Sequence, residues 1–246
     1  MSGQINSICR EDKILYKTTP LNVFLFLLKV VAVLFLLNFF VVAIRLLTGH
    51  DVVFGLIALF DMDKEGNLPT FISSVLLLIA SVLLFAQGLL DKKSGHGYVY
   101  YWFLLSFIFA FLSVDEFVSL HEKLTIIVRE YLEVGGVLYF AWVVPYSLLL
   151  VIFMFAFSRF LFALPGKTRK LFVFSGLIYV GGAVLIESIG GYIAENYGRA
   201  GVLYAIEYTL EETMEMIGVS LFIYSILRHM AASFGKIAVS LENGEI

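Results

Sequence analysis

Long apolar runs separated by short polar segments dominate the hydrophobic pattern of this chain. Each run has the roughly 20 residues that an α-helix needs to cross the hydrocarbon core of a bilayer. Six runs are predicted as transmembrane helices, over Leu21–Leu47, Thr70–Leu90, Gly97–His121, Val137–Ser158, Leu171–Ile193 and Val202–Leu227. The short alternating segments typical of a membrane β-barrel do not occur. The pattern therefore predicts an all-α polytopic transmembrane helical bundle.

A further apolar stretch, Val52–Phe60, lies in the long loop after the first predicted span. It is too short to cross a bilayer, so we expect it to lie at the interface or to re-enter the membrane. The first apolar run is itself too long for a signal-peptide core and is kept as a span.

Composition agrees with a membrane protein and excludes some partners. Hydrophobic residues make up 60% of the 246 residues and charged residues 15%, with a mean hydropathy of +0.93. Soluble domains are about half apolar and a quarter charged. No Lys/Arg-rich patch suits nucleic acid, and the single cysteine, Cys9, excludes an internal disulfide. The expected partners are the lipid bilayer and either a second copy of the chain or another subunit of a membrane complex.

Lysine and arginine alternate between rich and poor loops. The rich segments are the N-terminal tail, the loops after the second and fourth spans, and the C-terminal tail, with Arg10, Lys13, Lys17, Lys92, Lys93, Arg159, Lys167, Arg169, Lys170, Arg228 and Lys236. Basic residues favour the cytoplasmic side. We therefore predict a cytoplasmic N-terminal tail over residues 1–20, a six-helix domain over 21–227 and a cytoplasmic C-terminal tail over 228–246.

Acidic residues and one histidine lie within or at the ends of three predicted spans. They are Asp115, Glu116, His121 and Glu122 in the third, Glu187 in the fifth, and Glu207, Glu211, Glu212 and Glu215 in the sixth. Ionisable groups inside spans are costly and are functional candidates by default. The predicted topology places all three groups at one depth, in the outer half of the membrane. A shared pocket is the simplest interpretation.

Helical spacing indicates which of these side chains share a face. Asp115, Ser119 and Glu122 are spaced to lie on one face of a helix, whereas His121 is turned roughly 100–120° away and needs a local bend to join them. Glu207, Glu211 and Glu215 are spaced by four residues and form a second stripe.

Four glycines of the fifth span, Gly181, Gly182, Gly190 and Gly191, predict close helix packing around Glu187. Because small residues let neighbouring helices approach, the fifth helix is expected at the centre of the bundle.

So many carboxylates in a low-dielectric site require protons or bound cations. Oxygen ligands suit Mg, Ca or Mn, and one imidazole keeps Fe or Zn open. The predicted metal ligands are Asp115, His121, Glu122, Glu187, Glu211 and Glu215. Glu116, Glu207 and Glu212 are predicted to support them, with Arg45 as the counter-charge. The alternatives are a helix end emerging into solvent for the first group and a solvated helix start for the Glu207–Glu215 stripe, which would explain Glu207 well but not Glu215, two turns deeper.

A second acidic pattern occurs in the first outer loop, where Asp61, Asp63 and Glu65 alternate before Gly66. The spacing is that of the start of a calcium loop, but position 12 of the pattern is Ile72 and the closing acid is missing. A polar turn is the favoured interpretation.

Three sequence segments together resemble an uncharacterised family of bacterial multi-pass inner-membrane proteins. They are Gly66-Asn67-Leu68-Pro69-Thr70, Asp115-Glu116 with His121-Glu122, and Glu211-Glu212-x-x-Glu215-Met216-x-Gly218. The resemblance covers most of the chain and implies a bacterial inner membrane, but no activity.

Three functions are compatible with the sequence. A metal-dependent membrane enzyme open to the outer face is favoured, and a cation- or proton-coupled transporter or an accessory subunit of a membrane complex are the alternatives. An inverted repeat would map the end of the third span onto the end of the sixth, on opposite sides. The acids instead lie at the end of the third and the start of the sixth span, on one side. This disfavours simple alternating access.

Overall fold

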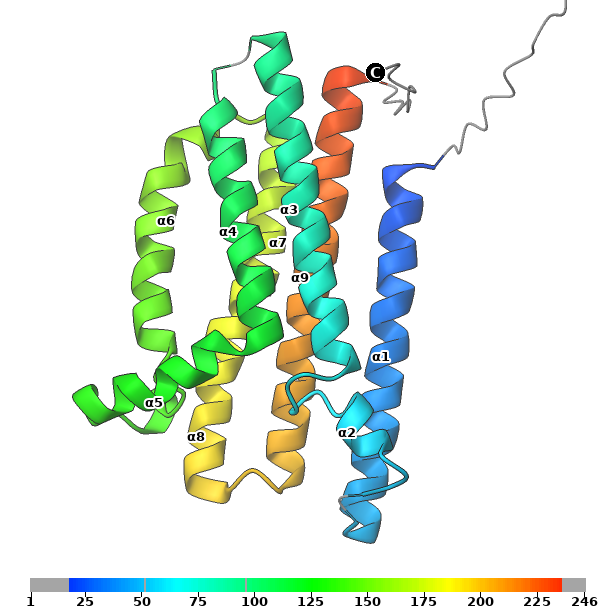
Figure 1. Ribbon diagram of the computed structural model, residues 1–246, viewed down its shortest axis with the longest axis vertical. Helices are drawn as coiled ribbons and strands as arrows, with labels where there is room; N and C mark the ends of the chain where they lie inside the picture. The colour runs from blue at the N-terminus through cyan, green and yellow to red at the C-terminus, as the bar shows by residue number, and fades with distance from the viewer. Residues whose placement is uncertain (1–17, 51, 96, 236–246) are drawn as a thin grey trace, which may run out of the picture.

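The computed structural model describes residues 18–50, 52–95 and 97–235, and that part of the chain is helical without a strand. Six apolar helices, each long enough to cross a membrane, run antiparallel in one bundle (Figure 1). They are α1 (Pro20–Thr48), α3 (Leu68–Ser94), α4 (Val99–Val118), α6 (Val143–Ala163), the continuous run Gly166–Tyr197, and α9 (Val202–Phe234). The prediction of an all-α polytopic bundle with six spans is confirmed.

Capping residues explain where two of these helices begin and end. The Thr19 hydroxyl accepts a hydrogen bond from the Asn22 amide at the start of α1, and the Asn67 side chain accepts one from the Thr70 amide at the start of α3. Such side chains satisfy amides that have no partner within the helix. Gly49 and Gly95 end the two helices in the left-handed conformation that glycine adopts readily.

The third span ends earlier than predicted. Helix α4 stops at Val118, Ser119 takes a left-handed conformation with φ of 53°, and α5 (Leu120–Leu132) then runs out sideways from the bundle (Figure 1). The predicted third span, Gly97–His121, therefore included residues that follow the turn. A short 3₁₀ turn, η1 (Gly136–Leu138), leads into the fourth span, which begins at Val143 and not at Val137.

The fifth span consists of α7 (Gly166–Val180), a π-helical turn η2 (Gly181–Ile186) and α8 (Glu187–Tyr197). Its four glycines face neighbours as predicted. A methyl group at Gly182 would lie 2.9 Å from the Glu211 carbonyl oxygen, and one at Gly191 would lie 3.1 Å from the Tyr139 Cβ. The close packing around this span is therefore confirmed.

The central helix, however, is α9 and not the fifth span. Helix α9 packs against α1, α3, α7, η2 and α8. In the apolar stretch of α9, 56% of the residues are buried, whereas only 17% are buried in the apolar stretch of the fifth span. The prediction was wrong because the glycines indicate only that one face of the fifth span packs closely. The opposite face of this span is exposed on α7 and α8.

The short apolar stretch after α1 forms a five-residue helix, α2 (Leu56–Phe60), that packs against α1 and α3 through the buried Ile57. It does not cross the bundle.

Helix α1 begins and α9 ends at one end of the bundle, hereafter the terminal end (Figure 1). The loops between α3 and α4 and between α6 and α7 lie at the same end, with Lys92, Lys93, Lys167, Arg169 and Lys170 in or beside them. Arg10, Lys13, Lys17 and Lys236 fall outside the described residues, as does most of each predicted tail. The cytoplasmic placement of this end stays a prediction.

Candidate metal centre

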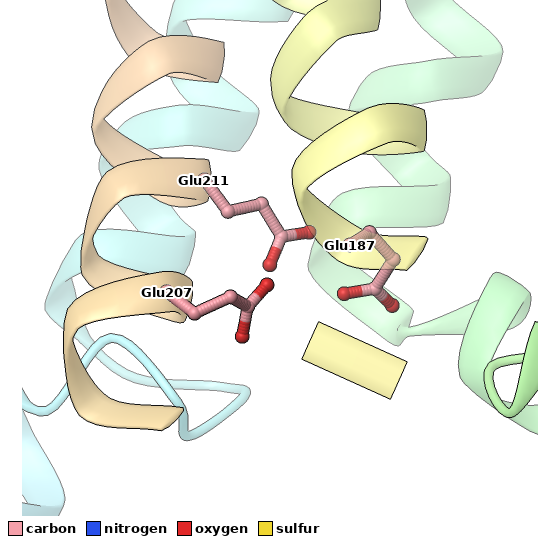
Figure 2. Close-up of side chains that lie close together, drawn as sticks. All are labelled: Glu187, Glu207 and Glu211. Carbon is pink, nitrogen blue, oxygen red and sulfur yellow. The ribbon is translucent and has the colours of Figure 1, made fainter. Parts of the chain in front are cut away.

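Three glutamates meet in the half of the bundle away from the terminal end. Glu207 and Glu211 lie one turn apart on α9, and Glu187 is the first residue of α8 (Figure 2). Each residue offers one carboxylate oxygen, and these oxygens all lie within 4.8 Å of one another. We call Glu187, Glu207 and Glu211 the glutamate triad.

Glu207 is the most unusual member of the triad. Its side chain is nearly inaccessible, with 5% relative exposure, and neither carboxylate oxygen has a hydrogen-bond partner among the described residues. The carboxylate lies against Gly190 of α8, where any side chain would collide with it. A buried carboxylate without a partner costs several kcal/mol if it is ionised. Its orientation toward Glu187 and Glu211 therefore needs a physical reason (Figure 2).

Glu187 is held by an aromatic donor, Trp142, which directly precedes α6. The indole nitrogen of Trp142 donates a hydrogen bond of 3.0 Å to Glu187 Oε1. The Trp142 ring also meets the His121 imidazole edge to face, with 5.0 Å between ring centroids. Trp142 thus connects the triad to the turn between α4 and α5.

At that turn, Asp115 and His121 form a pair. Asp115 Oδ1 accepts a hydrogen bond of 2.9 Å from the His121 amide and lies 3.4 Å from its Nδ1, while the Tyr146 hydroxyl donates to Oδ2 at 2.8 Å. Burial opposes the charge on the imidazole. The hydrogen bond and charge of Asp115, together with the charges of Glu116 and Glu65, outweigh burial and raise the pKa of His121 to about 9.

Further acids lie within electrostatic range of the pair and the triad. Glu215 interacts electrostatically with Glu116, His121 and Glu187, and Glu212 interacts with Glu116 and Glu215. The acids of α4, α8 and α9 thus share one polar region, as the predicted common depth required.

The family model for a domain of unknown function, DUF8692, matches residues 24–230. The chain belongs to this family. The match spans the whole bundle from α1 to near the end of α9, including the triad, the Asp115–His121 pair and Trp142. The resemblance to an uncharacterised family is thereby confirmed. The search of curated proteins and the search of solved structures gave no match.

The predicted ligand set is rearranged in this DUF8692 member. Glu187 and Glu211 belong to the triad, and Glu207, predicted only as a supporting residue, joins them. Asp115 and His121 form the separate pair beside it. They meet because the chain bends at the left-handed residue Ser119. In an uninterrupted helix the two side chains would lie on different faces.

Glu122 was predicted on the face of Asp115, and that prediction was wrong. The helix on which the spacing was counted ends at Val118, so Glu122 lies in the first turn of α5, where its side chain is exposed.

Arg45 was predicted as the counter-charge of the acidic group and instead stabilises the loop between α1 and α3. It pairs with the fully buried Asp61 at 2.5 Å and donates to the Tyr208 hydroxyl at 3.1 Å. The Asp61 carbonyl accepts a hydrogen bond from the Asn67 side chain, and Asp61 Oδ1 accepts one from the Asp63 amide. The polar-turn interpretation is confirmed.

Sequence reasoning missed three residues of this region. Trp142 and Tyr146 carry polar tips on otherwise apolar rings, and a polar tip inside a span usually has a partner there. Glu65 was assigned to the loop alone, yet it interacts electrostatically with His121 and Glu122 at the exposed edge of the acidic region. The detectable signal was its position directly before α3, at the depth predicted for the other acids.

Proposed function

We propose that this protein is a metal-dependent membrane enzyme whose divalent cation is held by Glu187, Glu207 and Glu211. The observation that carries the proposal is the Glu207 carboxylate, which is buried, has no hydrogen-bond partner in the described part of the chain and faces two further carboxylates. A divalent cation among the three oxygens would remove both the desolvation cost and the mutual repulsion.

The donor set favours a hard cation. All three groups of the triad are carboxylates, and oxygen ligands suit Mg²⁺, Ca²⁺ or Mn²⁺. Because His121 binds Asp115 and not the triad, Zn or Fe is less favoured as the bound metal than the sequence alone indicated. Trp142 would orient Glu187 as a metal ligand, in the manner of hydrogen-bonded groups around other metal sites.

The Asp115–His121 pair supports an enzyme over a purely structural metal site. Asp115 fixes the orientation of the imidazole, and Trp142 lies between that imidazole and Glu187. A bound metal polarises water or a substrate oxygen, and an oriented histidine nearby can hold or transfer a proton. Metal-assisted hydrolysis is the reaction class that best suits this combination.

We further propose the cellular setting. The basic residues gathered at the terminal end favour a cytoplasmic location for both termini, and the resemblance stated above favours a bacterial inner membrane. The triad would then lie in the outer half of the bilayer and act on a substrate that reaches it from the outer face.

Elemental analysis tests the metal centre directly. Full-length protein purified in detergent without chelator should contain about one Mg, Ca or Mn per chain. Glu207→Gln and Glu187→Gln keep the side-chain shape but remove a charged ligand, so each should reduce that content sharply. Glu130→Gln removes an exposed carboxylate of α5 and should leave it unchanged. Wild-type protein without metal, even after incubation with each ion, would overturn the proposal.

A cation- or proton-coupled transporter is the second candidate. It is supported by the succession of interacting acids from Glu65 through Glu116 and Glu215 to Glu187. Ion uptake into proteoliposomes distinguishes the two. A metal-binding protein without flux supports the enzyme, whereas uptake that is lost in Glu187→Gln and retained in Glu130→Gln supports transport.

A further inference from the structure

The terminal end of the bundle carries a cavity whose chemistry is opposite to that of the metal centre. The cavity has a volume of about 390 Å³ and lies where α7 begins and α9 nears its end. Its polar lining comes from Lys167 and Thr168 on α7 and from Arg228, His229 and Ser233 on α9. Such a volume lies within the range of ~300–1,000 Å³ that is usual for small-molecule sites.

The charge around this cavity is positive. Lys167 and Arg228 line it from two different helices, and Lys170 follows within one turn of α7. Among the described residues, one acidic residue, Asp91, lies in this half of the bundle. Its two carboxylate oxygens accept hydrogen bonds of 2.7 Å from Gln87 and Trp102. The other described acids lie in the opposite half or at its edge. Within the described residues, neither Lys167 nor Arg228 forms an ion pair with a carboxylate.

Buried side chains shape the inner wall. Thr168 and His229 are 7% and 6% exposed, and the Thr168 hydroxyl lies 3.3 Å from His229 Nδ1. The His229 imidazole also stacks on Trp102 at 5.3 Å between ring centroids. This wall is therefore fixed by packing, whereas Lys167 and Ser233 are exposed at the mouth.

The position of the cavity indicates the source of its ligand. It lies at the ends of two spans, which is the depth of lipid headgroups when the bundle is in a bilayer. Below it, Phe174 and Leu177 are 58% and 66% exposed and follow Lys170 at helical spacing on one face of α7. A basic headgroup site above an exposed apolar stripe matches an anionic phospholipid, with its phosphate in the cavity and an acyl chain along α7.

We propose that this cavity binds the phosphate of an anionic phospholipid from the leaflet at the terminal end, with Lys167 and Arg228 as the charged contacts. The proposal is independent of the metal centre. It assigns a second, lipid-binding site to the opposite half of the protein.

The test measures lipid binding to the full-length protein in neutral detergent by native mass spectrometry. Phosphatidylglycerol is titrated against phosphatidylcholine, and inorganic phosphate is added as a competitor. We expect about one phosphatidylglycerol bound per chain, in preference to phosphatidylcholine and undisturbed by inorganic phosphate. The double variant Lys167→Gln/Arg228→Gln should weaken this binding roughly 30-fold, because each basic contact contributes about 1 kcal/mol.

Two controls make the outcomes decisive. Lys92→Gln/Lys93→Gln removes the same charge from the terminal end outside the cavity and should bind normally, as should the charge-conserving Lys167→Arg/Arg228→Lys. Equal binding of the two lipids by wild-type protein would overturn the proposal whether or not the variants fold. An equal loss in the Lys92/Lys93 variant would reduce the effect to general surface charge. Displacement by inorganic phosphate would assign the cavity to a soluble anion.

Discussion

Replacing Glu207 by Gln should change the stability of the protein in opposite directions with and without metal. In the absence of metal, the triad brings three carboxylates within 4.8 Å of one another. Two unit charges at that separation repel by about 3 kcal/mol at an effective dielectric constant of ~20. Protonation of one member relieves part of this repulsion. We therefore expect the Glu207→Gln protein to gain about 1–3 kcal/mol of stability in chelator, because the amide removes one charge and keeps the shape.

With metal the order should reverse. A ligand that binds only the folded state at about 100 times its Kd stabilises that state by about 2.7 kcal/mol. The wild-type protein should receive this stabilisation, whereas the variant lacks one of the three ligands and should receive little of it. The two melting curves should thus exchange order between chelator and saturating Ca²⁺, Mn²⁺ or Mg²⁺.

The assay is thermal unfolding of the detergent-solubilised full-length protein, followed by tryptophan fluorescence in chelator and in each metal. Glu130→Gln serves as the matched control and should follow the wild type in both conditions. A variant that is destabilised equally in chelator and in metal would refute the reasoning, since Glu207 would then be a packing residue. A wild-type melting temperature that no metal changes would refute it as well.

Three further predictions concern packing, pH and topology. Gly190→Ala should lower the free energy of unfolding by about 1–3 kcal/mol and lower metal affinity, because its methyl group collides with the Glu207 carboxylate. A methyl group at Gly176 meets no neighbour among the described residues, so Gly176→Ala should cost little by comparison. Chemical denaturation and metal titration measure the two effects. The raised pKa of His121 contributes stability that is present below the unfolded-state pKa of about 6.5 and is lost as pH rises through about 9. The free energy of unfolding of His121→Gln should therefore be lower than that of the wild type by a few kcal/mol at pH 6 and by almost nothing at pH 10. An identical loss at both pH values would contradict the pairing with Asp115. A reporter that is active only outside the cytoplasm should be silent when fused after Ile246, and strong activity would reverse the proposed orientation.

The spans and the depth of the acids could be predicted because each depends on local pattern. A run of about 20 apolar residues has few alternatives to crossing the bilayer, and alternation of the loops then places Asp115, Glu187 and Glu211 in one half of the bundle. Thr19 and Asn67 mark helix starts through short-range hydrogen bonds that need no knowledge of tertiary packing.

The details of the site depend on tertiary contacts and could not be predicted in this way. Nothing in the residues around Ser119 requires a positive φ, yet that turn brings His121 to Asp115 and places Glu122 on a different helix from Asp115. Spacing placed Glu207 on the stripe of Glu211 but did not indicate how α9 is rotated toward α8. Arg45 was assigned to the acids by depth alone, although the nearer carboxylate of Asp61 neutralises it once the loop folds back.

The π-helical turn at Gly181–Ile186 makes the number of residues in the fifth span as important as their chemistry. A π turn spaces its hydrogen bonds by five residues instead of four and so accommodates one residue more than an α-helical turn. Successive residues of an α-helix are rotated by about 100° around its axis. Deleting the one extra residue would therefore let the turn close to α-helical geometry and leave α8 close to its present orientation. Deleting a second residue would rotate all of α8 by about 100° relative to α7, and the carboxylate of Glu187 would point away from α9 with no side chain altered. Members of the family that keep the triad should have this length or one residue fewer, even where the apolar residues of the turn are exchanged.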